Sequence, residues 1–495
     1  MASYDLLISG ARVVSPDRDE PVEADIAVRD GRVLAVEPGL DAENAHQVVD
    51  AGGRLAFPGL VDAHQHWGIY NPLEVDSRTE SRACAQGGVT TGITYMRTGQ
   101  YYLNRGGSYQ EFFPEVLRLT EGRAHVDYAY HLAPMMRTHI DEFETLVERF
   151  GVTSFKIFMF YGSHGLHGRS VDQSSFLMIP ADQQYDYAHF EFVMRGIQRA
   201  RNALPDIADD ISLSLHCETA EIMRAYTQIV EEDGTLQGLE AYSASRPPHS
   251  EGLAITIASY LAHETGLPTI NLLHLSSAKA MEAALLMAET FPHVDFRREV
   301  TVGHLLATYE SAAGIGGKVN PPLRGEEDRA VLWDAVLGGD VDWIVSDHAC
   351  CRNETKFGSD GDDVFAAKSG FGGTEYLLPG VITEGRKRGL SWGRMAALTS
   401  RNPAQRYGLH TKGDLAPGYD ADVVLVDPDR SYVVHATDSE SSQEYSPFEG
   451  FELTAAVDHV FLRGRQIVRD GNVVGDPAGR YLSRPTRRDE RAGKR

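Results

Sequence analysis

From about residue 57 to residue 404, short apolar runs alternate with longer segments of helical period, and this alternation constrains the fold more than any other feature. Runs such as residues 155–160 and 270–275 are apolar almost throughout, which is typical of parallel strands buried on both faces. Eight strands are predicted, near residues 60, 91, 127, 154, 211, 269, 294 and 342, each followed by room for one helix. The sequence therefore predicts an α/β fold with a (β/α)8 TIM barrel over residues 57–409.

Both ends of the chain have a different, all-β texture. Short alternating segments separated by turn clusters occupy the first 56 residues, and strand-like segments return after residue 410. The last two of these segments are joined through Arg463-Gly464-Arg465, which predicts a hairpin. We expect residues 1–56 and 410–480 to fold together as a small β-sandwich domain, and the charged tail at 481–495 to be surface or disordered.

Charge narrows the range of partners. The chain has 47 Lys and Arg residues against 71 Asp and Glu residues, a formal net charge of −24, which repels phosphate backbones and anionic headgroups. The first residues do not resemble a secretory signal, no apolar run reaches the length of a membrane span, and four cysteines are too few for a disulfide framework. We expect a cytoplasmic protein that binds neither nucleic acid nor membrane.

Side chains that ligate metals follow several of the predicted strands. His64 and His66 are spaced so that both imidazoles point the same way from extended chain and can hold one ion. His216, His274 and Asp347 each come just past an apolar run, at the strand ends where barrel enzymes place their chemistry. An isolated His-x-His is more often a pair of loop histidines, but the repetition at four strand ends favours a metal site.

Lys156 is flanked by apolar residues within the fourth predicted strand. Burying an unpaired ammonium costs several kcal/mol, and burial lowers a lysine pKa, so this side chain needs a partner or a modification. A neutral amine can take up CO2 to become a carbamate, which resembles a carboxylate ligand. The alternative is an ammonium that reaches an acid at the barrel mouth.

Together these motifs resemble the cyclic amidohydrolases of the amidohydrolase superfamily, which include dihydropyrimidinases, hydantoinases and allantoinases. The similarity covers nearly the whole chain. The motifs that carry it are Gly59-Leu60-Val61-Asp62-Ala63-His64-Gln65-His66, Phe155-Lys156-Ile157-Phe158-Met159, His274-Leu275-Ser276-Ser277, Pro321-Pro322-Leu323-Arg324, Ser346-Asp347-His348, Gly413-Asp414-Leu415-Ala416-Pro417-Gly418-Tyr419-Asp420-Ala421-Asp422 and Tyr445-Ser446-Pro447-Phe448-Glu449-Gly450.

The resemblance implies a centre of two divalent metal ions, usually zinc, with a bridging hydroxide that attacks the cyclic amide. The residues that it assigns to the metals are His64, His66 and Asp347 on one ion, His216 and His274 on the other, and a carboxylated Lys156 between them. Asp347 would also carry the proton to the leaving nitrogen. Tyr161, five residues after Lys156, matches the hydantoinase tyrosine that stabilises the oxyanion; a core or rim tyrosine is its alternative.

The substrate-binding positions depart from the family patterns. Dihydroorotases have a carboxylate-binding arginine where this chain has Gly68, so dihydroorotate is disfavoured. Trp67 is expected either to shape the pocket or to pack in the core. Arg97 is expected either to bind an anionic or carbonyl-rich group of the substrate or to form a structural salt bridge. Asn320 stands where dihydropyrimidinases have a serine, and Asn353 lies one residue past the position of the hydantoinase asparagine that binds the ring.

The sequence therefore predicts a metal-dependent hydrolase of the dihydropyrimidinase or hydantoinase type that opens a cyclic amide. An allantoinase-like or dihydroorotase-like hydrolase is the alternative. A noncatalytic scaffold relative is disfavoured, because such proteins lose metal ligands and here all six ligand positions are filled. The resemblance also implies a homo-oligomer, expected to be a tetramer.

Overall fold

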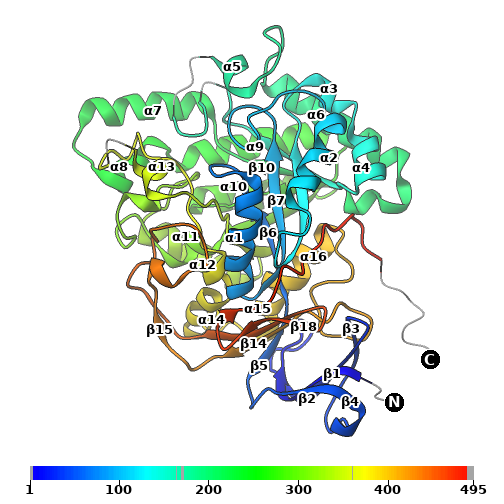
Figure 1. Ribbon diagram of the computed structural model, residues 1–495. Coiled ribbons are helices and arrows are strands. Elements are labelled where there is room, and N and C mark those ends of the chain that lie inside the picture. The colour runs from blue at the N-terminus through cyan, green and yellow to red at the C-terminus, as the bar shows by residue number, and fades with distance from the viewer. Residues whose placement is uncertain (1–3, 163, 169–171, 359–360, 488–495) are drawn as a thin grey trace.

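The computed structural model describes residues 4–162, 164–168, 172–358 and 361–487. A parallel barrel with its helices forms the larger part of the molecule, and a β domain lies beneath it (Figure 1). The barrel sheet has the strand order β13-β12-β11-β10-β9-β8-β7-β6. Its strands are β6 (Leu60–Gln65), β7 (Val89–Arg97), β8 (Asp127–Ala133), β9 (Ser154–Phe158), β10 (Ser212–His216), β11 (Thr269–Leu272), β12 (Asp295–Thr301) and β13 (Trp343–Val345).

The barrel closes between its first and last strands. Just past their ends, the backbone N–H of His66 donates to the carbonyl of His348 over 2.8 Å, and Gln65 and His348 form a parallel bridge. Every residue of β6, β7, β9, β10 and β13 is buried, as parallel strands covered on both faces require. The predicted (β/α)8 barrel and its eight strands are therefore confirmed.

Helices alternate with the strands and cover the barrel. The longer ones are α1 (Leu73–Gln86), α2 (Tyr109–Thr120), α4 (Phe143–Phe150), α6 (Tyr187–Ala203), α7 (Ala220–Asp233), α8 (Gly238–Ser245), α9 (Pro248–Thr265), α10 (Ala278–Thr290), α12 (Glu326–Gly338) and α14 (Leu377–Lys387). The shorter ones are α3 (Arg137–Ile140), α5 (Gln173–Leu177), α11 (Val302–Leu306), α13 (Asn353–Phe357), α15 (Trp392–Ala396) and α16 (Asn402–Arg406).

Helix α4 illustrates why these segments are helical. Phe143, Leu146, Val147 and Phe150 recur at the helical spacing and are all buried, so one stripe of the helix faces the barrel. The helix ends at Gly151, whose left-handed backbone (φ +66°) accommodates the chain reversal into β9.

The two chain ends form one nine-stranded sheet, which confirms that they fold together. Its order is β19-β18-β17-β14-β5-β1-β2-β3, and β4 pairs with β1. The strands are β1 (Tyr4–Val13), β2 (Val22–Arg29), β3 (Arg32–Glu37), β4 (Ala45–Asp50), β5 (Leu55–Pro58), β14 (Val423–Asp427), β17 (Ala456–Leu462), β18 (Arg465–Arg469) and β19 (Asn472–Val473); β15 (Tyr432–Val433) and β16 (Glu452–Leu453) form a separate ribbon. Residues from both ends share one small core, including Ile8, Ile26, Val423 and Phe461.

The hairpin predicted between the last long strands is present as β17 and β18. Arg463 and Gly464 at its turn both have positive φ, +48° and +76°. Positive φ at both central residues is typical of the type I′ turn, which commonly joins two strands of a hairpin.

The prediction of a surface or disordered tail is wrong for residues 481–487. Arg484 is only 2% exposed, and its Nη1 donates over 2.8 Å to Ser154 Oγ beneath β9. Thr486 forms a parallel bridge with Leu409, and the backbone N–H of Leu482 donates to the carbonyl of Tyr128. The charged composition predicted a solvated tail, but the buried Arg484 binds residues of the barrel and fixes this segment. Residues 488–495 lie outside the described residues.

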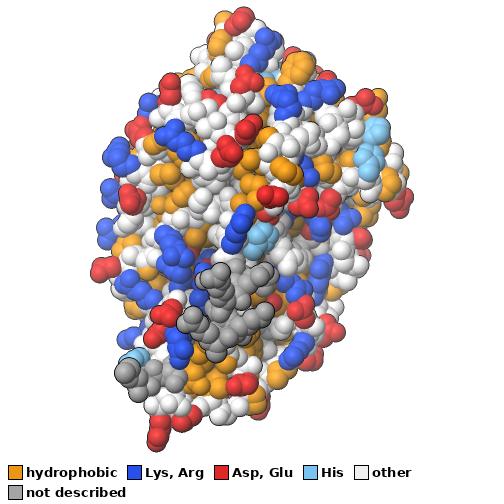
Figure 2. Space-filling view, turned by 90° about the vertical axis from the view of Figure 1, so that its right-hand side faces the viewer, with side chains coloured by type: hydrophobic (Ala, Val, Ile, Leu, Met, Phe, Trp, Pro, Cys, Tyr) orange, Lys and Arg blue, Asp and Glu red, His pale blue; other side chains and the backbone are white. Residues whose placement is uncertain are grey.

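Acidic and basic side chains are interspersed over the face that Figure 2 shows. Among the helices of the described residues, none combines the length and the apolar character that crossing a membrane requires.

Candidate metal centre

The six predicted metal ligands lie together at the carboxyl ends of the barrel strands. They are His64 in β6, His66 just after it, Lys156 in β9, His216 at the end of β10, His274 after β11 and Asp347 after β13. All six are buried, with Asp347 and His66 the most exposed at 8% each. One cavity is lined by His66, Lys156, His216, His274 and Asp347, so the positions inferred from strand ends converge on one site.

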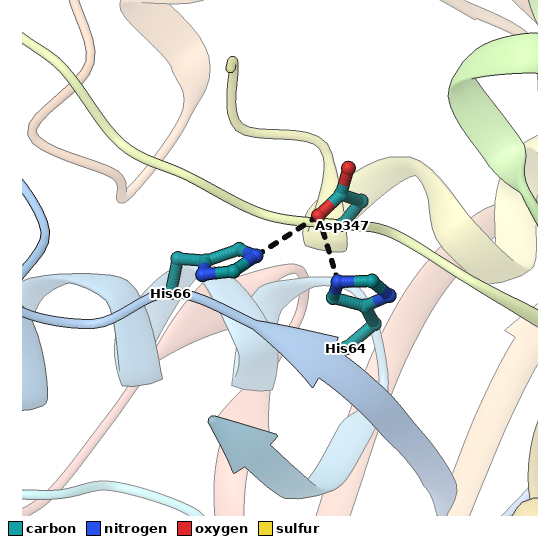
Figure 3. A group of neighbouring side chains, drawn as sticks. All are labelled: His64, His66 and Asp347. Atoms are coloured by element: carbon teal, nitrogen blue, oxygen red, sulfur yellow. Dashed lines mark ion pairs between the residues drawn. The ribbon is translucent and has the colours of Figure 1, made fainter. Parts of the chain in front are cut away.

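His64, His66 and Asp347 form the first group (Figure 3). Nε2 of His64 lies 3.1 Å from Oδ1 of Asp347, and Nε2 of His66 lies 3.2 Å from the same oxygen. One possible ligand atom from each of the three residues lies within 4.8 Å of the other two. Imidazole nitrogen and carboxylate oxygen directed at one point suit a divalent cation such as zinc.

The other ring nitrogen of His64 and His66 has its own partner. Nδ1 of His64 lies 2.7 Å from Oε1 of Glu299, and Nδ1 of His66 lies 2.6 Å from the hydroxyl of Tyr102. Glu299 also accepts from Trp343 Nε1 at 2.9 Å. A carboxylate that accepts the Nδ1 proton of His64 leaves the Nε2 lone pair facing Asp347, as metal-binding histidines require.

His216 and His274 form the second group. Their rings meet edge to face with centroids 4.3 Å apart, and His274 is 5.3 Å from His64. Nε2 of His216 lies 2.7 Å from Oε2 of Glu218, which also accepts from Arg246 Nη1, so the Nδ1 lone pair of His216 is left for a ligand.

The buried Nδ1 of His274 has no hydrogen-bond partner among the described residues. A buried polar atom without a partner is costly, and a bound cation would satisfy it. This atom and the donor set around it show that the residues present fit a metal centre.

Burial keeps the candidate imidazoles neutral. It lowers the pKa values of His64, His66 and His274 well below the ordinary histidine value, and the charge of Lys156 lowers them further. A neutral imidazole offers the lone pair that metal binding needs.

Lys156 is buried in the centre of the site, as predicted. Its Nζ is 3.1 Å from Nε2 of His64 and lies over the rings of Tyr95 and Phe158, 3.9 and 4.4 Å from their centroids. No carboxylate among the described residues is within ion-pair distance of it. Burial lowers the pKa of Lys156 to about 7, against the opposing charges of Asp347 and Glu299. The predicted alternative of an ammonium paired with an acid is therefore absent from the described residues.

Two of the candidate ligands have unusual backbone conformations. His274 has φ +35° and Asp347 has φ +57°, in the left-handed region that residues other than glycine seldom adopt. Such strain persists where surrounding structure enforces it, and it concentrates at functional sites. It turns both side chains from the strand ends into the cavity.

Tyr161 and Asn320 also line the cavity. The Tyr161 ring stacks on Phe158 at 4.9 Å and meets Phe176 edge to face at 5.3 Å. The Asn320 amide is fixed by the Tyr242 hydroxyl, which donates to Oδ1 over 2.5 Å, and by its own donation to the Leu166 carbonyl.

Three other residues predicted to bind substrate are not among the described residues that line the cavity. Trp67 is fully buried and packs against Tyr128 at 6.1 Å, so its predicted contact with substrate is wrong and its packing alternative holds. Asn353 is exposed at the start of α13, where its side chain does not line the cavity. Arg97 is buried behind the cavity wall, and no described carboxylate forms the predicted structural salt bridge with it.

Sequence reasoning missed the carboxylates that orient the histidines. Glu299 lies inside β12 and Glu218 two residues after His216, and both are fully buried. The first half of β12 is charged and only partly buried, so nothing in the strand singles out Glu299 from the sequence alone.

Known proteins that resemble this chain match it over nearly its whole length. The family model described as "Amidohydrolase family" matches residues 208–467. An allantoinase of Rubrobacter xylanophilus is 32% identical over 492 residues, which are 98% of this chain and 99% of that protein. An allantoinase of Desulfitobacterium hafniense is 28% identical over 490 residues, 97% of this chain and 99% of that protein.

Solved structures show the same similarity in three dimensions. A D-hydantoinase has a TM-score of 0.83 at 26% identity, covering 97% of this chain and 99% of that one. The L-hydantoinase (dihydropyrimidinase) of Arthrobacter aurescens has a TM-score of 0.82 at 26% identity, covering 97% and 100%. The similarity therefore includes both the barrel and the β domain.

Proposed function

This chain belongs to the amidohydrolase family, and from that premise we propose that it is a metal-dependent enzyme that hydrolyses a cyclic amide bond. The observation that carries the proposal is the convergence of the candidate ligands on one place: five of the six line one cavity, and the sixth, His64, contacts Asp347 and Lys156. The relatives named allantoinase and the structural neighbours named hydantoinase and dihydropyrimidinase support a ring amide as the bond that is opened.

We assign the residues to two divalent ions, expected to be zinc. His64, His66 and Asp347 would hold one ion, and His216 and His274 the other. When bound, such ions polarise the scissile carbonyl and lower the pKa of a water molecule.

Lys156 would join the two groups as a carbamate. The neutral amine attacks CO2 through Nζ, a carbon–nitrogen bond forms and one proton leaves, so a buried cation becomes an anionic ligand. The lowered pKa of Lys156 favours the neutral amine that this reaction needs.

The remaining roles belong to side chains in the cavity wall. Asp347 would take a proton from the attacking water at its carboxylate and transfer it to the ring nitrogen as the carbon–nitrogen bond breaks. Tyr161 would donate its hydroxyl proton to the oxygen that becomes negative in the transition state. Asn320 would orient the ring through its backbone, because its side-chain amide is already engaged by Tyr242, Ser369 and Leu166.

The substrate is proposed to be an uncharged cyclic ureide or imide with five or six ring atoms. The cavity wall contains Tyr102, Phe158, Phe160 and Tyr161, which offer aromatic surface to a flat ring. The position of the dihydroorotase arginine is Gly68, which has no side chain to pair with a ring carboxylate. A dihydroorotase-like activity is thus the weaker alternative, whereas an allantoinase-like activity is compatible with this site.

A ring-opening screen by mass spectrometry tests this proposal. Hydantoin, an aryl hydantoin, allantoin, dihydrouracil, a cyclic imide and dihydroorotate would be offered in parallel. We expect a higher kcat/KM for at least one uncharged ring than for dihydroorotate. A clear preference for dihydroorotate would refute the substrate class, and the absence of turnover on every ring would favour a noncatalytic relative.

We also propose that the chain forms a homotetramer in the cytoplasm. Large apolar side chains are exposed on neighbouring outer helices: Ile229 on α7 (57%), Tyr260 on α9 (55%) and Leu286 on α10 (55%). Apolar residues so exposed are typical of interfaces. The four cysteines are free, which fits a reducing compartment. Light scattering should give the mass of four chains, and Tyr260→Lys should lower it; a monomeric wild type would reject the assembly.

A further inference from the structure

Arg97 is a buried cation without a carboxylate partner. It ends β7, is 2% exposed, and its Nη1 donates over 3.0 Å to the carbonyl of Thr98. Its Nε and Nη2 have no hydrogen-bond partner, and no ion pair joins it to another described residue. A buried charge that is not compensated is strongly destabilising, so a cation held at this position points to a use.

Aromatic rings surround this guanidinium. Its Cζ lies 5.2 Å from the ring centroid of Tyr161, 5.6 Å from that of Tyr102 and 5.0 Å from that of Phe176. Each distance is within the range of a cation–π contact. The rings of Tyr161 and Tyr102 line the cavity, so Arg97 supports the cavity wall from behind.

The electrostatic effect of this arrangement is directional. Burial raises the pKa of Tyr161, and the positive charge of Arg97 opposes that rise. The charge of Arg97 stabilises negative charge that develops in the cavity near Tyr161, and it has little effect on a neutral substrate. This effect is strong because buried surroundings screen charge poorly.

We propose that Arg97 is a positioning residue for ring opening: it holds Tyr161 against the cavity and supplies fixed positive charge behind the hydroxyl that meets the developing oxyanion. This proposal rests on the proposed function. Because Arg97 acts through Tyr161, its removal should lower kcat and leave KM nearly unchanged.

The test is a double-mutant cycle on the purified full-length enzyme with the best uncharged ring from the screen. Arg97→Met keeps the length and packing of the side chain but removes its charge. We expect it to lower kcat about 10- to 100-fold with KM changed less than about threefold. In a Tyr161→Phe background the same change should cost less than about threefold, because the hydroxyl through which it acts is gone.

Conservative and distant variants separate this role from a packing defect. Arg97→Lys keeps the charge and should recover a substantial part of kcat, and Arg97→Gln gives a second neutral variant if Arg97→Met folds poorly. Arg149→Met is the matched control, because Arg149 also lies over a ring, 5.0 Å from the centroid of Phe150, but is exposed on α4. It should leave kcat unchanged.

Three results would overturn the assignment. An unchanged kcat in both neutral variants would show that the charge is not used. Equal losses in the wild-type and Tyr161→Phe backgrounds would show that Arg97 acts independently of that hydroxyl, and a loss confined to KM would make it a direct substrate contact. An inactive wild type rejects the proposed function itself, whereas an active wild type with unaffected Arg97 variants rejects only this inference.

Discussion

Oε1 of Glu299 lies 2.7 Å from Nδ1 of His64, and both side chains are completely buried. Burial raises the pKa of Glu299 to about 8, and the hydrogen bond from Trp343 is the largest influence that opposes this rise. A divalent cation in the site would favour the carboxylate further, since it adds positive charge nearby. The carboxylate then holds the Nδ1 proton of His64 and keeps its Nε2 directed at the site.

Glu299→Gln should therefore weaken metal binding. A neutral amide accepts the Nδ1 proton less strongly, and loss of such an orienting partner typically lowers metal affinity about 10- to 100-fold. Competition with a chelator of known zinc affinity measures this change. Glu282→Gln, at an exposed site on α10, is the control and should bind metal like the wild type. Equal affinities in all three proteins would show that Glu299 does not orient His64 for metal binding.

Lys156→Ala should be inactive, because it removes the atom that becomes the carbamate. Acetate or propionate added with zinc should restore part of the activity by occupying the same space as a carboxylate ligand. Turnover with and without the added acid, at fixed ionic strength, is the measurement. Wild-type turnover by Lys156→Ala alone would exclude the carbamate bridge.

The strand ends could be predicted from the sequence because each ligand follows its own apolar run, so local pattern was sufficient to place His216, His274 and Asp347. The carboxylates that orient the histidines depend on contacts between distant segments. His64 and Glu299 are 235 residues apart in the chain, and one sequence contains no signal that pairs them.

The direction in which a side chain points was the second feature that the sequence could not predict. Trp67 is next to a metal ligand, yet its backbone N–H donates to Thr94 Oγ1 over 2.9 Å and its indole packs against Tyr128. Arg484 was expected in a solvated tail from its charged neighbours, but its guanidinium binds beneath the barrel. Proximity in sequence and local composition do not determine either orientation.

The stability of the protein should depend on pH through Lys356, a buried residue of α13. Its Nζ donates to the carbonyls of Lys318 and Gly370 over 3.1 and 2.7 Å, and Gly370 lines the cavity. Burial lowers the pKa of Lys356 from 10.5 to about 7. Between pH 7 and pH 10.5 the amine of Lys356 is protonated in the unfolded chain and neutral in the folded one. The contribution of this group to the free energy of unfolding therefore rises with pH, by about 1.4 kcal/mol per pH unit at most.

Comparison with Lys356→Met isolates this contribution. Between pH 7 and pH 9 the melting temperature of the wild type should rise relative to that of the variant, because the neutral amine no longer carries a buried charge. Lys279→Met, at an exposed position on α10, should show no such change relative to the wild type. A difference between the wild type and Lys356→Met that is constant over this range would show that Lys356 does not change protonation there.

We propose that ring opening requires two metal ions held by these six residues, and a zinc titration of the metal-depleted full-length protein tests this requirement. Ring-opening activity, followed against zinc added per chain, should start near zero and level off at two ions, and His64→Ala should bind less zinc and remain inactive. Full activity in the metal-free protein, or in His64→Ala, would show that ring opening does not need these ions.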